Sequence, residues 1–231
     1  MEAVLPIFLE IFIMTPEKEA DRMKYEVMAG ALAAALFLGG CAGSGAGQGA
    51  SSAPPAAPKA ASAARVPSSQ SEQLYEEALA AYQKGEKEAA LSLSDRAIRE
   101  DPENYKALSL KGLVIALTSS PEEGILWIGK ALDLEPDYVQ GWYDMAMAQK
   151  LAGHYDQSIQ YFQKVLGKDR ANTWSYYGIA TNYADKRDKK EALSYLKKAL
   201  ALDRTAVRAA AAEQDHFQWL HGDPDFEALL Q

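Results

Sequence analysis

The sequence predicts an all-α fold: an α-solenoid of about four helix-turn-helix repeats, followed by C-terminal capping helices. Three observations lead to this fold class. Small residues recur every 34 positions, large residues keep the same period, and an aromatic tail follows the last repeat. A 34-residue period is that of a helix-turn-helix solenoid unit, which packs only against its neighbours in the array. The pattern predicts an architecture and does not identify a partner.

The chain begins with two segments that are predicted to be absent from the mature protein. Residues 1–22 are expected to be a misassigned start or an N-terminal extension, because Met23 opens an ordinary signal sequence. Residues 23–40 are expected to be a signal peptide. Their uncharged part, Val27 to Gly40, has the length of a signal-peptide core and falls short of the roughly 20 residues needed to span a bilayer.

The only cysteine, Cys41, ends the sequence Leu38-Gly39-Gly40-Cys41. These four residues resemble the lipobox of bacterial lipoproteins. The resemblance implies that Cys41 carries a diacylglycerol and becomes the mature N-terminus, and that Ala42 permits transfer to the outer membrane. A buried free cysteine is the alternative, but it does not account for the low-complexity stretch that follows. With one cysteine, no disulfide framework is predicted.

The lipidated cysteine and a linker occupy residues 41–70. After Cys41 the segment consists almost entirely of Ala, Gly, Ser, Pro and Gln. Such a composition cannot bury enough apolar surface to offset its ordering entropy, so disorder is expected. As a flexible coil the linker would span roughly 30 Å. It would therefore act as a tether for the repeats.

The predicted repeats occupy residues 71–204, in the segments 71–104, 105–138, 139–172 and 173–204. Their eighth, twentieth and twenty-seventh positions are small in all cases but one. These residues are Ala78, Gly112, Ala146 and Ala180; Ala90, Gly124, Ser158 and Ala192; and Ala97, Ala131, Val165 and Ala199. Small side chains allow antiparallel helices to approach closely, and Gly112 is expected to face Ala131.

Large residues keep the same register at the fourth and twenty-eighth positions. They are Leu74, Leu108, Trp142 and Tyr176, and Ile98, Leu132, Leu166 and Leu200. Together with Ala146, Gly153, Tyr155 and Phe162, this pattern resembles the tetratricopeptide repeat (TPR) family. Glu77 and Lys111 depart from it where Leu is usual. The alternative is an ordinary helical bundle with accidental periodicity.

Local signals agree with helical hairpins. Ser120 and Pro121 are predicted to cap and open a helix, with Glu123 completing a capping box. Gly85 and Gly153 are expected in the turns between paired helices, where a positive φ is useful. Residues 205–231 are predicted to form the cap that covers the last repeat. Its apolar residues are Phe217, Trp219, Leu220, Phe226 and Leu229.

The TPR resemblance implies that the first helix of each repeat lines a concave groove. The peptide-groove positions carried over from the family are Tyr75, Leu79, Tyr82, Leu113, Leu117, Tyr143, Met147, Lys150, Trp174 and Tyr177, with Asp185 beside them and Lys106 and Gln140 at the rim. Tyr143, Met147, Trp174 and Tyr177 are expected to be partly exposed, whereas Trp142 and Tyr176 pack. Leu79 and Leu113 replace the Asn of carboxylate-binding TPR domains, so a ligand read mainly by apolar contacts is expected. For any one tyrosine, a role in the core is an equal alternative.

Composition and motifs disfavour other classes. The net charge is −8 and no basic cluster occurs, which disfavours nucleic acid binding. No phosphate loop, nucleophile elbow or metal-ligand motif is found, so no enzyme activity, cofactor or metal is predicted. The expected function is a lipid-anchored adaptor or assembly scaffold for other proteins or peptide segments of a bacterial envelope, on the outer membrane facing the periplasm. The alternative is a structural protein that self-assembles without a cognate peptide.

Overall fold

The computed structural model describes residues 66–231, which form ten α-helices and one 3-10 helix without a strand in that range. In chain order they are α3 (Ser69–Gln83), α4 (Lys87–Glu100), α5 (Tyr105–Thr118), α6 (Pro121–Leu134), α7 (Val139–Leu151), α8 (Tyr155–Lys168), α9 (Thr173–Asp185), α10 (Lys189–Leu202), α11 (Arg204–Glu213), η1 (Asp215–Leu220) and α12 (Pro224–Leu230). The predicted extension, signal peptide, Cys41 and most of the linker lie outside the described residues.

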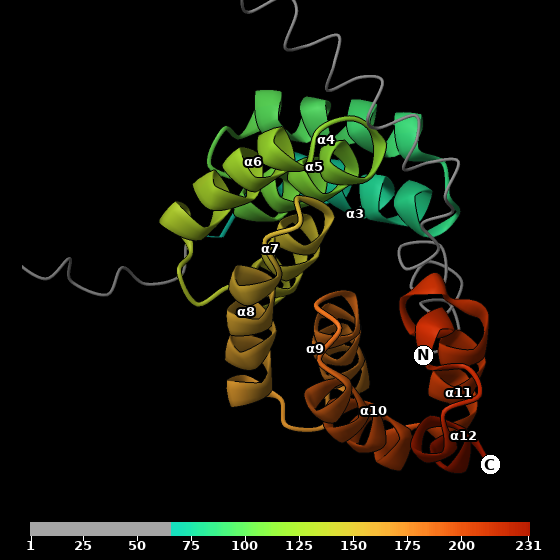
Figure 1. Cartoon of the computed structure of the whole chain (residues 1–231). Helices are drawn as coiled ribbons and strands as arrows, with labels where there is room; N and C mark the ends of the chain where they lie inside the picture. Colours follow the sequence, from blue (N-terminus) through green and yellow to red (C-terminus); the bar gives the residue numbers. More distant parts are fainter. Residues whose placement is uncertain (1–65) are drawn as a thin grey trace, which may run out of the picture. The chain divides into compact units, whose positions relative to one another are not determined.

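Consecutive helices pack as four hairpins: α3 with α4, α5 with α6, α7 with α8, and α9 with α10 (Figure 1). Each second helix also contacts the first helix of the next hairpin. The first helices α3, α5, α7 and α9 contact one another in succession. This arrangement is an all-α solenoid of helix-turn-helix units, which confirms the predicted fold class.

The hairpins are defined by local backbone chemistry. Gly85 and Gly153 adopt φ values of +78° and +77° in the turns after α3 and α7, as predicted. The corresponding turn after α9 places Arg187 at φ 62°, a conformation that non-glycine residues rarely adopt. Ser120 accepts a hydrogen bond from the backbone N–H of Glu123, and Pro121 opens α6, which confirms the predicted helix start.

Close helix approach within the second hairpin depends on two glycines. A Cβ atom on Gly124 would lie 2.5 Å from the backbone oxygen of Gly112, and one on Gly112 would lie 2.7 Å from that of Gly124. The expected pairing of Gly112 with Ala131 is therefore wrong, although Ala131 is fully buried. In an antiparallel hairpin the eighth position opposes the twentieth, and the twenty-seventh opposes the first. The first repeat illustrates the second pairing, because Ser71 Oγ donates to the Ala97 carbonyl oxygen at 2.8 Å.

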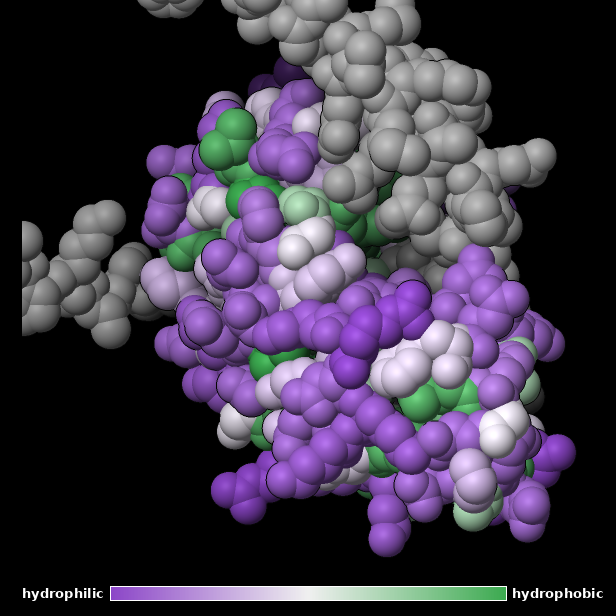
Figure 2. Space-filling model, in the orientation of Figure 1, coloured by the Kyte–Doolittle hydropathy of each residue, from purple (hydrophilic) through white to green (hydrophobic). Residues whose placement is uncertain are grey.

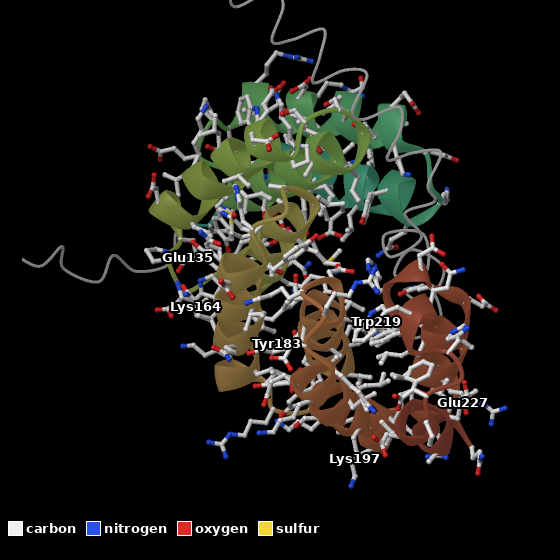
Figure 3. All side chains as sticks on the ribbon, in the orientation of Figure 1. Glu135, Lys164, Tyr183, Lys197, Trp219 and Glu227 are labelled. Atoms are coloured by element: carbon white, nitrogen blue, oxygen red, sulfur yellow. The ribbon has the colours of Figure 1, made fainter. Side chains whose placement is uncertain are left out.

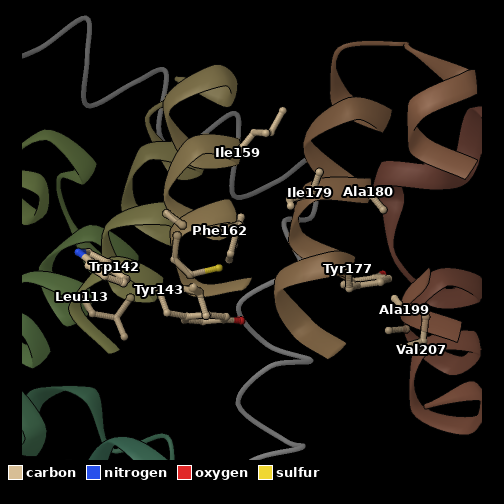
Figure 4. Packing of buried hydrophobic residues seen from close by; sticks show 14 of the residues in the cluster. Leu113, Trp142, Tyr143, Ile159, Phe162, Tyr177, Ile179, Ala180, Ala199 and Val207 are labelled. Atoms are coloured by element: carbon tan, nitrogen blue, oxygen red, sulfur yellow. The ribbon is translucent and has the colours of Figure 1, made fainter. Parts of the chain in front are cut away.

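The core continues between repeats through aromatic residues. The rings of Tyr143 and Phe162 meet edge to face at 5.4 Å between centroids (Figure 4). Gly178 lets α9 approach Phe162, since a Cβ there would lie 2.4 Å from that ring. Tyr177 extends from α9 toward Ala199 and Val207 (Figure 4). The third and fourth repeats thus share one apolar core.

The C-terminal segment covers the last repeat, as predicted. Phe217, Leu220 and Phe226 are buried, and the Phe217 and Phe226 rings stack at 5.7 Å. The segment contacts the last hairpin through η1 on α9, and through α11 and α12 on α10. Trp219 lies on the side of the cap that faces α9 (Figure 3). The Arg187 guanidinium carbon lies over the Trp219 ring, 5.1 Å from its centroid.

Candidate functional site

The candidate site is the face formed by the first helices, α3, α5, α7 and α9. Successive first helices contact one another, so the 34-residue period places equivalent positions of the four repeats next to one another along the array. Of the predicted groove residues, three are half-buried: Leu79, Leu117 and Trp174. The others are buried, namely Tyr75, Tyr82, Leu113, Tyr143, Met147, Lys150 and Tyr177.

The expected partial exposure is therefore found for Trp174 and is wrong for Tyr143, Met147 and Tyr177. Contacts between helices explain two of these differences. Tyr143 packs on Phe162 within its hairpin. Tyr177 donates a hydrogen bond to the Gln214 side-chain oxygen at 2.6 Å and lies 6.0 Å from the Phe217 ring. Both tyrosines belong to the core, and contact with a ligand remains a prediction. Tyr176, expected to pack, is half-buried and packs against the core.

A buried carboxylate lies between the second and third repeats. Asp144 of α7 accepts hydrogen bonds at 2.7 Å from Ser109 Oγ of α5 and from Gln140 Nε2 of its own helix. Burial raises the pKa of Asp144 to about 6, although both hydrogen bonds oppose this shift. Gln140 was placed at the groove rim, and here it holds this carboxylate. Asp144 itself was not identified from sequence.

At the start of the array, Lys106 of α5 forms an ion pair with Glu72 of α3. The Lys106 ammonium group also lies over the Tyr75 ring. The hydrogen bond to Glu72 raises the pKa of the Lys106 ammonium group. Glu72 and Lys106 occupy the second positions of neighbouring repeats. Lys106, which was predicted at the groove rim, is therefore already paired with a carboxylate of the preceding first helix.

A three-membered ionic cluster connects the third repeat, the fourth repeat and the cap. Lys150 Nζ lies 2.5 Å from Asp185 Oδ2, and His216 Nδ1 lies 2.6 Å from Asp185 Oδ1. Burial lowers the pKa of Lys150, and Asp185 opposes that shift. Burial also disfavours ionised Asp185, yet Lys150 and His216 outweigh it and hold its pKa below the usual value. Burial and Lys150 lower the pKa of His216, which favours the neutral imidazole.

The partly exposed groove residues of this face are apolar, namely Leu79, Leu117 and Trp174, and its lysines Lys106 and Lys150 form ion pairs within the chain. Among residues 66–231, no group of three or more His, Cys, Asp or Glu side chains could hold a metal ion. Within the same range, no helix combines the length and apolarity required to cross a bilayer. His216 contributes to the cluster with Lys150 and Asp185. The sequence alone gave no signal for it, since its partner is 31 residues away.

Comparisons with known proteins agree with this architecture. Residues 142–205 match the tetratricopeptide repeat family. A structure of MamA from Desulfovibrio magneticus RS-1, beginning at residue 41, is 15% identical, with a TM-score of 0.53; the match covers 71% of this chain and 96% of that chain. The structure of YrrB, described as a TPR protein with an unusual peptide-binding site, is 19% identical, with a TM-score of 0.52; it covers 62% of this chain and 74% of that chain. No curated protein matches the chain.

Proposed function

We propose that this chain is a lipid-anchored adaptor of a bacterial envelope that binds peptide segments of other proteins on its first-helix face. The observation that carries the proposal is the succession of first helices α3, α5, α7 and α9, on which Leu79, Leu117 and Trp174 remain partly exposed. Aromatic side chains give a large contact area at low conformational cost and dominate many binding interfaces. The family match at residues 142–205 supports a protein-binding scaffold, and YrrB offers a structural relative described as peptide-binding.

The proposed anchor is a lipid on Cys41. Support comes from the lipobox-like sequence Leu38 to Cys41, the apolar stretch before it and the low-complexity tether after it. Ala42 favours the outer membrane, with the repeats facing the periplasm. Since one acyl chain gives only marginal membrane binding, stable anchoring requires at least the two chains of a diacylglycerol. The tether would let the repeats reach partners away from the lipid surface.

The charges on this face define the ligand chemistry. Lys106 is paired with Glu72, and Lys150 with Asp185. Asp144 is buried and hydrogen-bonded. A charged ligand would have to displace these partners, so we infer recognition of an apolar peptide segment. Salt screens exposed charge pairs and leaves apolar contact largely unaffected. The affinity of the peptide should therefore change little between low and high salt.

The groove is tested by comparing two tryptophan variants of the full chain. Proteins captured from envelope extracts by the wild type, and lost with Trp174→Ala, are the candidate partners. Trp127→Ala on α6 is the control, because Trp127 lies on a second helix against Lys111 and Lys130. Titration calorimetry with a peptide of the captured protein then measures affinity. Equal capture by the Trp174 and Trp127 variants, or an affinity that falls steeply with salt, contradicts the proposal.

The anchor is tested separately by fractionating cells that express Cys41→Ser. The variant is expected either to leave the membrane fraction or to accumulate as an uncleaved precursor, while its helical circular dichroism is retained. Mature, membrane-bound Cys41→Ser protein would disprove lipidation. That result would leave the peptide-binding proposal intact.

A further inference from the structure

The second helix of the second repeat presents an unusual outer face. Leu126 of α6 is 67% exposed, and Leu134 is 41% exposed on the same helix. The residues that correspond to Leu126 in the other three repeats are Ser92, Gln160 and Ser194, all polar and exposed. Figure 2 shows hydrophobic residues interrupting a mainly hydrophilic surface in the upper left, where Figure 1 places α6. The repeat pattern does not require a leucine at this position.

Charges of opposite sign flank Leu126 along α6. Glu122 and Glu123 precede it by about one helical turn, and Lys130 follows it by one turn on the same exposed face. Gly129 lies beside Lys130, and a Cβ atom there would meet nothing within 4 Å. The face thus combines an apolar centre, opposite charges on either side and open space above the backbone. These are the features of a helix that packs against another helix.

We propose that α6 is a self-association surface, on which a second copy of this chain packs its own α6 in antiparallel orientation about a two-fold axis near Leu126. A two-fold interface uses the same patch on both copies, so each residue meets its symmetry-related counterpart. Leu126 then packs on Leu126 of the second copy. Lys130 of each copy faces Glu122 and Glu123 of the other.

The charge order selects this arrangement over its alternatives. In a parallel pair the glutamates would oppose glutamates and Lys130 would oppose Lys130, and like charges in contact are unfavourable. The antiparallel pair replaces both repulsions with two equivalent attractions. A single helix pair buries less than the roughly 1,200 Å² typical of stable complexes, so the dimer is weak and depends on concentration. The inference does not depend on peptide binding, because α6 is a second helix and the groove lies on first helices.

Cysteine cross-linking tests the two-fold axis. In a Cys41→Ser background, full-length Leu126→Cys should form a disulfide-linked dimer under mild oxidation. The two-fold axis brings the Cα atoms of the two copies of residue 126 close enough for a disulfide bond. Gln160→Cys is the matched control, since Gln160 occupies the same repeat position on α8 and is exposed. We expect a several-fold higher yield for position 126. Equal yields at the two positions would overturn the proposal.

Charge exchange tests the orientation in the same Leu126→Cys background. Lys130→Glu should lower the cross-linking yield, with each of the two equivalent pairs contributing about two- to five-fold. Adding Glu122→Lys and Glu123→Lys to Lys130→Glu restores opposite charges across the axis and should restore the yield. Circular dichroism of each variant shows whether the repeats remain folded. A yield that ignores Lys130→Glu, or that is not restored by the exchange, overturns the antiparallel arrangement.

Discussion

Gly124 and Gly129 lie on the same helix, yet replacing each by alanine should change stability in opposite directions. Alanine is a better helix former than glycine by about 1 kcal/mol, so both substitutions gain this term. At Gly129 nothing lies within 4 Å of the added methyl, and the gain should appear almost unopposed. At Gly124 the methyl would lie 2.5 Å from the Gly112 oxygen and 2.6 Å from Ala116 Cβ. Two of the nearest atoms at Gly124 belong to backbone, so α5 and α6 must separate.

Overpacking of this kind costs about 1 to 3 kcal/mol, and backbone contacts place Gly124→Ala toward the upper end. After the helix-propensity gain, we expect Gly124→Ala to destabilise by about 1 to 2 kcal/mol and Gly129→Ala to stabilise by up to about 1 kcal/mol. Thermal unfolding followed by circular dichroism should then show Tm values that differ by at least about 4 °C between the variants. Equal Tm values would mean that the hairpin can open at no cost, which would refute the reasoning.

Three further predictions concern buried side chains. Trp142→Ala should destabilise by about 3 to 5 kcal/mol, as measured by urea unfolding, because Trp142 is buried. Trp174 is only half-buried against the core, so Trp174→Ala should destabilise by less than Trp142→Ala in the same titration. The pKa of Asp144 is about 6 in the folded state and 3.8 in the unfolded state. Between pH 4 and pH 6 the folded state therefore binds a proton that the unfolded state has released, so the free energy of unfolding of the wild type falls as the pH rises through this range. Asp144→Asn should therefore gain stability relative to the wild type over that range, by up to about 3 kcal/mol, and then level off; a constant difference from pH 4 to 7 would contradict this. Asp185→Asn removes the carboxylate charge paired with buried Lys150 and should destabilise the protein by about 1 to 3 kcal/mol at pH 7, as measured by urea unfolding.

The architecture was predictable because it depends on local and periodic signals. Gly85, Gly153 and Pro121 act within one turn, and the 34-residue register needs only a count along the chain. The turn after α9 carried no such signal, since Arg187 adopts positive φ without being glycine. Register within a hairpin was also beyond the pattern: both the twentieth and twenty-seventh positions are small, and only the antiparallel geometry selects Gly124 for Gly112.

Burial on the candidate site depends on contacts that no periodicity encodes. Tyr177 is buried by Phe217 and Gln214, which lie outside the repeat pattern and 37 or more residues further along the chain. The pKa of Asp144 depends on its burial and on Ser109, 35 residues before it. The TPR resemblance names positions by their average role in a family. It does not specify which of those positions a particular cap will cover.

The ionic cluster of Lys150, Asp185 and His216 limits how the array can be divided. Solenoids are commonly shortened, extended or recombined at repeat boundaries, because each unit contacts only its neighbours. A cut after α10 would remove His216 and Gln214, leaving Asp185 and the Tyr177 hydroxyl without these partners. The third repeat would also be affected, because Lys150 shares Asp185. For protein engineering, the smallest transferable C-terminal module is therefore α7 through α12, whereas a boundary between α6 and α7 leaves this cluster intact.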